Sequence, residues 1–375
     1  MSTDATIALY VHFPWCTRKC PYCDFNSHAV TNGIPESAYI QQLLMDLDQD
    51  LSLLDDPPCV TSIFFGGGTP SLFQPEAISN LLAGVKQRVA LDPLAEITLE
   101  ANPGTTDYAK FAGYVQAGVN RLSMGVQSLN DVQLKALGRI HSADDARQAF
   151  LAARSAGFEN INLDLMHGLP GQTLAAAMDD LQQALDLGPE HLSWYQLTIE
   201  PNTSFFRYPP TLPNDDALWS IYSAGLLRLA AHGFDRYEIS AFAAKERFSA
   251  HNLNYWQFGN YLGIGAGAHG KLQSQGQLVR TTKTRVPADY LKAPHRRSLP
   301  IDKDSLVLEF LMNSLRLTRG FEWTTFEKNT GLSRIDLDRF VAKGRGKGLL
   351  TLTPTGLQPT TQGLQFLNDL LLLVD

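Results

Sequence analysis

Strand-like and helix-like segments alternate through the first 200 residues, and this alternation limits the possible folds more than any other feature of the sequence. Six short runs are rich in β-branched and aromatic residues, which is typical of strands. The stretches between them carry apolar residues at helical spacing. Such an order predicts parallel strands joined by crossover helices. The predicted strands cover residues 5–14, 60–68, 96–104, 120–128, 160–168 and 191–200, and the predicted helices include 36–54, 75–89, 142–156 and 174–187.

The predicted strands are almost continuously apolar, so we expect both faces of the sheet to be buried. Six strand–helix units within about 200 residues favour a curved, barrel-like sheet over a flat one. The sequence therefore predicts an α/β fold, a partial (β/α)6 barrel with a smaller C-terminal domain. In such folds the functional side chains gather at the carboxyl ends of the strands.

The composition shifts near residue 281, which predicts a domain boundary. We expect residues 1–280 to form the barrel with a capping segment that includes a loop over 250–270. Residues 281–375 are expected to form a winged-helix-like domain behind a linker at 284–300. Its predicted elements are helices at 305–317, 323–329 and 335–343, strands at 349–354 and 356–360, and a last helix at 362–374.

The chain carries 31 basic and 38 acidic side chains, a net charge of −7. This balance offers no general attraction to nucleic acid or to an anionic membrane. A basic cluster at 343–347 is interleaved with glycines and is interpreted as a solvated turn, so no nucleic-acid partner is expected. No apolar run approaches the roughly 20 residues of a membrane-spanning helix. We expect a cytoplasmic protein, with a peripheral position at the inner membrane as a further expectation.

Three of the four cysteines lie close together in the sequence. Cys16, Cys20 and Cys23 follow the first predicted strand with the spacing C-x3-C-x2-C. Three thiolates on one short loop can hold three irons of a [4Fe–4S] cluster and leave the fourth iron open to a small molecule. The alternative is a zinc site, which would need a fourth ligand from a nearby histidine or from the distant Cys59.

A glycine-rich turn, FGGGTP at 65–70, follows the second predicted strand. Consecutive glycines allow the backbone to approach a polar ligand closely, and Thr69 adds a hydroxyl. An ordinary tight turn is the simpler interpretation of the same residues.

The cysteine motif, the aromatic Tyr22 within it and the GGGTP turn together resemble the radical S-adenosylmethionine (SAM) superfamily. The resemblance implies that SAM chelates the open iron and that reduction of the cluster cleaves SAM to a 5′-deoxyadenosyl radical. A cluster with four protein ligands would have no position for SAM.

Seven phrases in order resemble the oxygen-independent coproporphyrinogen III oxidase group of that superfamily. They are LYVHFPWCTRKCPYCDFNSH, FFGGGTPSL, ITLEANPGT, RLSMGVQS, LGRIHS, NLDLMHGLPGQT and YQLTIEPNT. The resemblance implies a set of SAM-site residues. These are Tyr10 and Tyr22 beside the cluster; Gly67, Gly68 and Thr69 at the methionine moiety; and Glu100, Gln127, Arg139 and Asp164 at its carboxylate, its ribose and the polar groups nearby.

Two features separate the chain from the oxidase pattern. Phe25 stands where the oxidases carry a fourth cysteine, and only 15 residues precede Cys16. The CDF ending of the cysteine motif and the sequence HNLNYW at 251–256 instead resemble the HemW group of heme chaperones. This resemblance implies heme binding and delivery of heme to apo-hemoproteins, notably membrane-bound respiratory enzymes. Whether the chain is also an enzyme stays open, with coproporphyrinogen III oxidation as the alternative and SAM-dependent modification of RNA or protein as a third.

The heme ligand implied by the HNLNYW motif is His251, since an imidazole is a strong axial ligand for heme iron. The alternative is a structural role, in which His251 bonds a backbone carbonyl while Tyr255 and Trp256 pack on the barrel. Other histidines that could ligate heme are His12, His141, His167 and His269.

Overall fold

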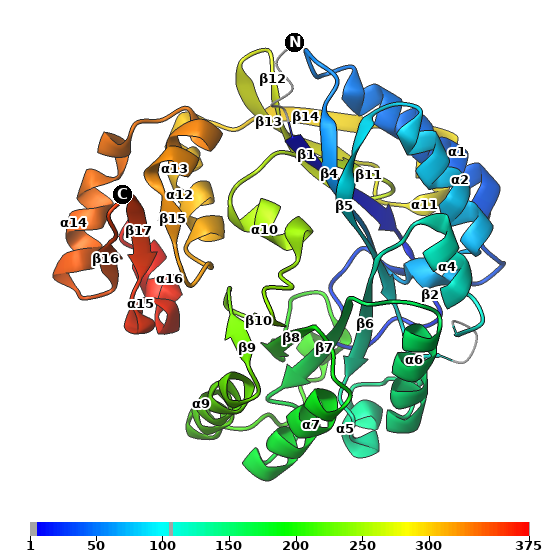
Figure 1. Ribbon diagram of the computed structural model, residues 1–375, viewed down its shortest axis with the longest axis horizontal. Coiled ribbons are helices and arrows are strands. Elements are labelled where there is room, and N and C mark those ends of the chain that lie inside the picture. Colours follow the sequence, from blue (N-terminus) through cyan, green and yellow to red (C-terminus); the bar gives the residue numbers. More distant parts are fainter. Residues whose placement is uncertain (1–5, 105–107, 375) are drawn as a thin grey trace.

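The computed structural model describes residues 6–104 and 108–374. Its centre is a run of six parallel strands within a twelve-stranded mixed sheet (Figure 1). The strands are β1 (Thr6–Phe13), β4 (Cys59–Gly67), β5 (Ala90–Ala101), β6 (Arg121–Gln127), β7 (Ile161–His167) and β8 (His191–Gln196). The predicted α/β partial barrel and its six strands are confirmed.

Helices cover the outer face of the parallel strands (Figure 1). The helices predicted at 142–156 and 174–187 begin within one residue of the expected start, and each has a side-chain cap. The Ser142 hydroxyl accepts from the Asp145 N–H, and the Asp145 carboxylate accepts from the Ser142 N–H, which closes a capping box. The helices in this part are α1 (Glu36–Leu51), α2 (Pro75–Lys86), α4 (Phe111–Ala117), α5 (Asp131–Ala136), α6 (Ala143–Ser155), α7 (Leu174–Asp186), α8 (Ser204–Arg207) and α9 (Asp215–Ala231), with the short helix η1 (Pro70–Leu72).

The sheet continues on both sides of the parallel strands. On one side β10 (Ala241–Ala244) pairs antiparallel with β8, and β9 (Phe234–Arg236) pairs with β10. On the other side β11 (Tyr261–Ile264) pairs parallel with β1. A short separate sheet, β2 (Trp15–Cys16) with β3 (His28–Ala29), frames the cysteine loop.

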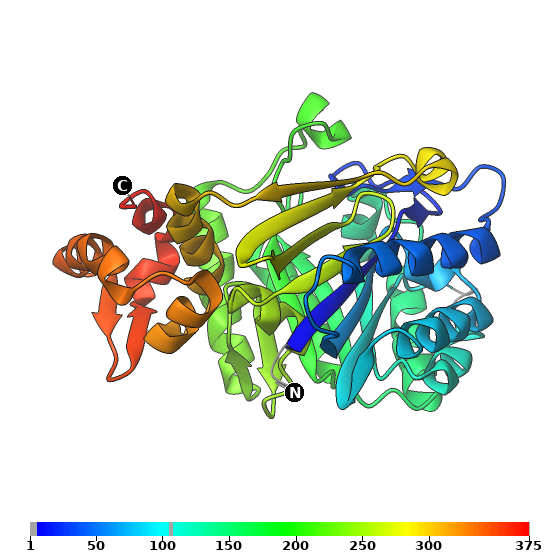
Figure 2. The same ribbon diagram turned by 90° about the horizontal axis from the view of Figure 1, so that it is seen from above.

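The expected loop at 250–270 and the expected linker at 284–300 are wrong. The first contains helix α10 (Ala250–Trp256) and strand β11, and the second contains α11 (Pro287–Lys292) and β14 (Arg296–Pro300). Strand β11 supplies the partner that the backbone of β1 needs on its open side. Strands β12 (His269–Ser274), β13 (Gln277–Lys283) and β14 then extend the sheet, as Figure 2 shows in yellow.

A second hydrophobic core lies beside the barrel (Figure 2) and includes Phe310, Phe326 and Leu357. The predicted single last helix is two short helices, because Phe366 between them leaves the helical region with φ −110° and ψ 45°. The elements here are α12 (Lys303–Ser314), β15 (Phe321–Glu322), α13 (Trp323–Thr330), η2 (Arg334–Leu337), α14 (Asp338–Gly346), β16 (Leu350–Leu352), β17 (Gly356–Pro359), α15 (Thr361–Gln365) and α16 (Leu367–Leu371).

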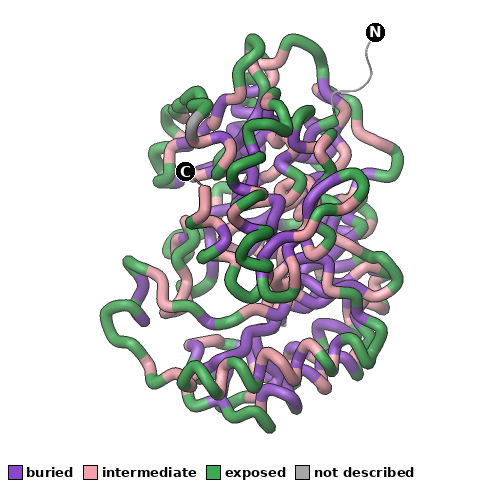
Figure 3. Tube along the Cα trace, turned by 90° about the vertical axis from the view of Figure 1, so that its left-hand side faces the viewer, coloured by how far each residue is buried: buried purple, intermediate pink, exposed green. Residues whose placement is uncertain are grey.

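The division of the chain into 1–280 and 281–375 stays a proposal. Strand β13 runs across residue 280, and the large sheet ends at Pro300. Figure 3 shows buried backbone concentrated in the centre and exposed backbone on the outer turns. Among residues 6–104 and 108–374, no helix is long and apolar enough to cross a lipid bilayer.

Candidate functional site

A cavity of about 290 Å³ lies at the carboxyl ends of the parallel strands, and we call it the cluster pocket. All three motif cysteines line it. So do eight of the nine residues that the family resemblance assigns to SAM. These are Tyr22, Gly67, Gly68, Thr69, Glu100, Gln127, Arg139 and Asp164. The folded chain therefore brings together groups that span almost 150 residues of sequence.

The three thiols of the cluster pocket are free cysteines that face one space. Cys16 is buried at the end of β2, while Cys20 and Cys23 are half-buried. Burial raises the pKa of the Cys16 thiol, and a hydrogen bond from Ser27 opposes that shift. The Arg139 Nη1 lies 3.6 Å from the Cys20 sulfur. The guanidinium is therefore in hydrogen-bond contact with one of the three sulfurs.

The arrangement of the thiols fits a cuboidal cluster better than a single zinc ion. A structural zinc ion needs four side chains around one point, and a catalytic one needs three. Within the described ranges 6–104 and 108–374, no three His, Cys, Asp or Glu side chains are placed to share one ion. Cys59 stands at the start of β4, a nine-residue strand whose far end reaches the pocket, so it lies roughly 25 Å away. A cube binds its three thiolates at three separate irons, so the sulfurs need only face a common space.

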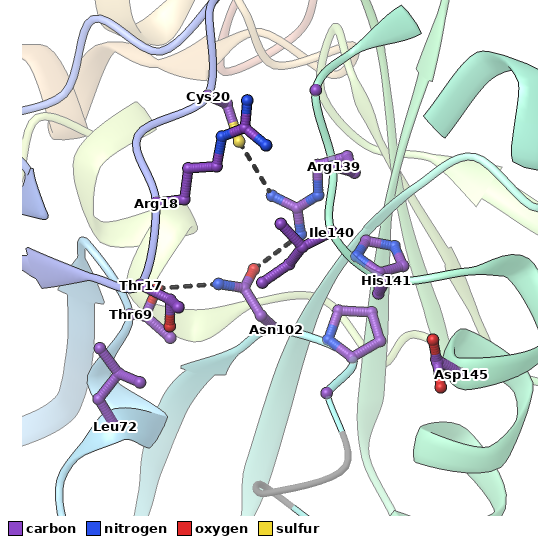
Figure 4. A pocket seen from close by; sticks show the side chains of 13 residues that line it. Thr17, Arg18, Cys20, Thr69, Leu72, Asn102, Arg139, Ile140, His141 and Asp145 are labelled. Atoms are coloured by element: carbon purple, nitrogen blue, oxygen red, sulfur yellow. Dashed lines mark hydrogen bonds between the residues drawn. The ribbon is translucent and has the colours of Figure 1, made fainter. Parts of the chain in front are cut away.

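A chain of hydrogen bonds fixes Arg139 against the cysteine loop (Figure 4). The Asn102 Nδ2 donates to the Thr69 hydroxyl at 2.8 Å, and the Asn102 Oδ1 accepts from Arg139 Nη2 at 2.8 Å. Arg139 also donates to the Gly125 carbonyl at 2.7 Å. The Arg139 Nε is buried and has no hydrogen-bond partner among the described residues. The guanidinium is thus held in place while one of its donors stays free for a ligand.

Asn102 is a site residue that the sequence analysis missed. It sits directly after β5, two positions beyond Glu100, in the phrase ITLEANPGT. Its position at the end of a predicted strand is the sequence feature that could have identified it as a site residue. Tyr195 was also missed. Tyr195 lies on β8, two strands away from Gln127 on β6. Its hydroxyl donates to the Gln127 Oε1 at 2.7 Å.

Glu100 and Asp164 place two carboxyl groups in the wall of the cluster pocket. Burial, with a smaller contribution from Asp164, raises the pKa of Glu100 to about 8. Burial also raises the pKa of Asp164, although hydrogen bonds from Asn162 and Ser193 oppose this. The Gly67 N–H donates to Glu100 at 3.0 Å. Desolvated acidic groups of this kind gain from a ligand that offers hydroxyl donors.

The glycine-rich turn is shaped by packing as well as by the pocket. Gly67 has φ +114°, and a Cβ there would lie 2.4 Å from the His12 ring. A Cβ on Gly68 would lie 2.3 Å from the Trp15 carbonyl oxygen. The N–H groups of Gly68 and Thr69 donate to the carbonyls of Phe13 and Trp15. The turn can therefore offer a ligand carbonyl oxygens but not these two donors.

Tyr10 is the one proposed SAM residue outside the cluster pocket. It lines a neighbouring cavity of about 670 Å³, which we call the second cavity. The Tyr10 hydroxyl is hydrogen-bonded to His12 Nδ1 at 2.9 Å. The two cavities adjoin, because Phe25, Gly67 and Glu100 line both.

His251 lies on α10 and is buried, with both ring nitrogens engaged. Its Nδ1 is 2.9 Å from the Ser62 hydroxyl and its Nε2 is 3.0 Å from the Tyr255 hydroxyl. Burial lowers the pKa of His251 to about 3, so the ring is neutral. The partners are hydroxyl groups, not the backbone carbonyl expected for a structural role. Axial ligation by His251 would break one of these bonds, and the assignment stays a prediction.

Comparison with known proteins identifies the family of the chain. Residues 10–184 match the family model of the radical SAM superfamily, and residues 301–366 match that of the HemN C-terminal domain. The chain is 48% identical to a protein named heme chaperone HemW from Haemophilus influenzae over 373 residues, 97% of each chain. It is 48% identical to the Escherichia coli protein of the same name over 371 residues, again 97% of each chain.

More distant relatives extend the comparison. Radical S-adenosyl methionine domain-containing protein 1 of mouse mitochondria is 38% identical in an alignment of 389 positions that covers 99% of this chain and 88% of the mouse protein. The structure of coproporphyrinogen III oxidase (HemN) from Escherichia coli has a TM-score of 0.82 at 21% identity, and the match covers 100% of this chain and 91% of that one. At this identity the likeness shows the fold. By its full-length relatives, the chain belongs to the HemW family of the radical SAM superfamily.

Proposed function

We propose that this protein binds heme and delivers it to apo-hemoproteins, including membrane-bound respiratory enzymes, while carrying a [4Fe–4S] cluster and SAM. The radical SAM family implies the cluster and SAM. The observation that supports the heme function most directly is the second cavity, which adjoins the cluster pocket through Phe25, Gly67 and Glu100. Its volume of about 670 Å³ lies within the range of roughly 300–1,000 Å³ for ligand and cofactor sites.

We assign the cluster to Cys16, Cys20 and Cys23. When bound, it supplies an iron with an open coordination position and a one-electron donor. The residues proposed to hold SAM are Tyr22, Gly67, Gly68, Thr69, Glu100, Gln127, Arg139 and Asp164, with Tyr10 at the boundary to the second cavity.

The roles of these side chains follow from their chemistry. The planar fork of Arg139, whose Nε is unpartnered, suits the carboxylate of a methionine moiety. The carbonyl oxygens of the turn at Gly67 and Gly68 suit its amino group. Glu100 and Asp164 can accept hydrogen bonds from ribose hydroxyls. Each of these groups is already positioned by a bond to the protein, so little ordering is needed on binding.

We place the protein in the cytoplasm, at the inner-membrane surface when it meets membrane-bound recipients. The absence of a bilayer-crossing helix among the described residues is consistent with this placement.

An anaerobic heme titration followed by a transfer assay tests the proposal. We expect the reconstituted protein to bind stoichiometric heme, measured by difference absorption. It should also raise the heme content of an apo-hemoprotein above that reached with free heme alone. Failure to bind heme, or equal loading of the recipient without the protein, would overturn the proposal.

Coproporphyrinogen III oxidation is the second candidate function, because the chain shares its fold with an enzyme of that activity. The position of the fourth cysteine of the oxidases is Phe25, whose side chain is 64% exposed at the rim of both cavities. Anaerobic incubation with SAM, a reductant and coproporphyrinogen III decides between the functions. We expect no protoporphyrinogen, and its formation at catalytic turnover would favour the oxidase.

A further inference from the structure

The histidines around the second cavity differ in whether a ring nitrogen is free. The His12 Nδ1 is bonded to the Tyr10 hydroxyl and its Nε2 to the Asn26 carbonyl, each at 2.9 Å. His251 is bonded at both nitrogens as described above. His269 lines the cavity, is exposed, and makes no side-chain hydrogen bond to any residue that the structure describes. Of these three imidazoles, His269 alone can bind a metal without losing a bond to the protein.

We propose that His269, and not His251, provides the protein's axial ligand to heme iron in the second cavity. This inference rests on the proposed heme function and names the ligand and the site. His251 then acts as a positioning residue, because its Nε2 holds the hydroxyl of Tyr255, which is part of the cavity wall.

The backbone that carries His269 is fixed although its ring is free. His269 starts β12 and pairs with Thr282 of β13. The backbone also packs closely on β11, since a Cβ on Gly263 would come within 1.7 Å of the His269 carbonyl oxygen. The imidazole therefore has a defined origin and a side chain free to turn toward a ligand.

The rest of the cavity suits a flat, apolar ring with anionic substituents. Tyr255 and Tyr261 stand edge to face with centroids 4.6 Å apart, and Tyr10 also lines the cavity. Such rings offer large apolar area to a macrocycle. Arg285 lines the cavity and is exposed, which places a cation where a heme propionate can pair with it. Burial and the charges of Arg280 and Arg285 lower the pKa of His269, which favours the neutral, ligating form.

His167 offers a matched control, because it is another histidine with a free nitrogen. Its Nδ1 is buried without a hydrogen-bond partner among the described residues, and its ring lies 4.2 Å from that of Trp194. It lines a separate cavity of about 380 Å³, which shares no lining residue with the second cavity.

The test compares anaerobic heme titrations of the reconstituted wild type with those of His269→Ala, His251→Ala and His167→Ala. Iron and sulfide contents equal to wild type serve as the check on folding. For His269→Ala we expect a shifted Soret band and an affinity lower by about tenfold or more. Added imidazole should restore the wild-type spectrum, because it can occupy the vacated iron position.

For His251→Ala we expect weaker binding with the wild-type ligation spectrum and no rescue by imidazole. His167→Ala should behave as wild type. An unchanged spectrum and affinity in His269→Ala, or rescue by imidazole confined to His251→Ala or His167→Ala, would overturn the assignment while leaving heme binding intact. Absence of heme binding by the wild type would instead overturn the proposed function itself.

Discussion

The two adjoining cavities are built in different ways. In the cluster pocket the polar side chains are bonded to one another, as in the series Thr69, Asn102 and Arg139. In the second cavity Tyr10, His12 and Tyr255 are bonded too, but His269 has no side-chain hydrogen bond to any described residue and Arg285 is exposed. A pre-bonded site has little entropy left to lose and holds a resident group tightly. A site with free ligating groups suits a cargo that must leave again. Under the proposed function, the cluster pocket is the cofactor site and the second cavity is the site from which heme is delivered.

The largest expected effect comes from the cysteine loop. Cys20→Ala should remove the cluster entirely, because the cluster pocket offers only three thiols and Arg139 contacts this one. Iron and sulfide analysis after anaerobic reconstitution measures the loss.

Cys59→Ala is the control for that measurement and should retain full iron and sulfide, since Cys59 lies at the opposite end of β4. Full cluster content in Cys20→Ala would contradict the assignment, and cluster loss in Cys59→Ala would make Cys59 a ligand.

The second prediction tests whether the hydrogen bonds among Thr69, Asn102 and Arg139 are needed for SAM binding. Asn102→Ala removes the link between Thr69 and Arg139 and leaves buried polar atoms unpaired, at a cost of about 1–3 kcal/mol. We expect SAM affinity, measured by anaerobic equilibrium dialysis, to fall by roughly 10- to 100-fold.

Asn313→Ala provides the matched control, since this asparagine makes a hydrogen bond within α12, outside both cavities. It should bind SAM as wild type does. An equal loss of SAM affinity in both variants would mean that the network has no special role.

The third prediction concerns the pH dependence of stability. The pKa of Glu100 is raised from 4.5 to about 8, so the folded protein holds this proton more tightly than the unfolded chain does. Glu100 therefore contributes to the free energy of unfolding at low pH. This contribution, on the order of a few kcal/mol, is lost as pH rises from 4.5 to 8.

Glu100→Gln keeps a neutral side chain at every pH. In the SAM-free protein, we expect denaturant unfolding of wild type and variant to differ most at pH 8, with the variant the more stable. Parallel pH profiles for the two proteins would show that the pKa of Glu100 is the same in the folded and the unfolded protein.

The smallest effect is expected in the wall of the second cavity. Ser62→Ala removes the partner of His251 Nδ1 but leaves the bond from Nε2 to Tyr255. If His251 is a positioning residue, heme affinity should change by no more than about threefold. A heme titration that shows a tenfold gain would instead point to His251 Nδ1 as a ligand released by the substitution.

Much of the fold was predictable because the signals were local. The apolar strands and the cap at Ser142 each carry their own pattern, and the structure confirms them. The region 250–300 was misassigned because most of the pairing of β11 is with β1, more than 240 residues earlier in the chain. Lys283 stands directly before the expected linker, and its ammonium group is buried between the carboxylates of Asp46 and Asp50 of α1. Neither the strand that pairs with β11 nor the carboxylates that contact Lys283 can be identified from nearby sequence.

The parts of the candidate site that belong to recognisable sequence motifs were predictable. The cysteine spacing and the strand-end residues converge on one cavity as expected. Hydrogen-bond partners were not predictable, because they depend on which side chains meet across strands. Asn102 joins Thr69 to Arg139 from a third element, and the occupied nitrogens of His251 depend on Ser62 of β4.

Phe25, Gly67 and Glu100 belong to the walls of both compartments. A ligand bound in the cluster pocket or in the second cavity therefore changes a surface that contacts the ligand of the other cavity. Thermodynamic reciprocity then fixes the relation between them: whatever factor SAM imposes on the dissociation constant of the porphyrin, the porphyrin imposes on that of SAM. A single coupling free energy, transmitted through the three shared residues, would then change the affinities for both molecules by the same factor.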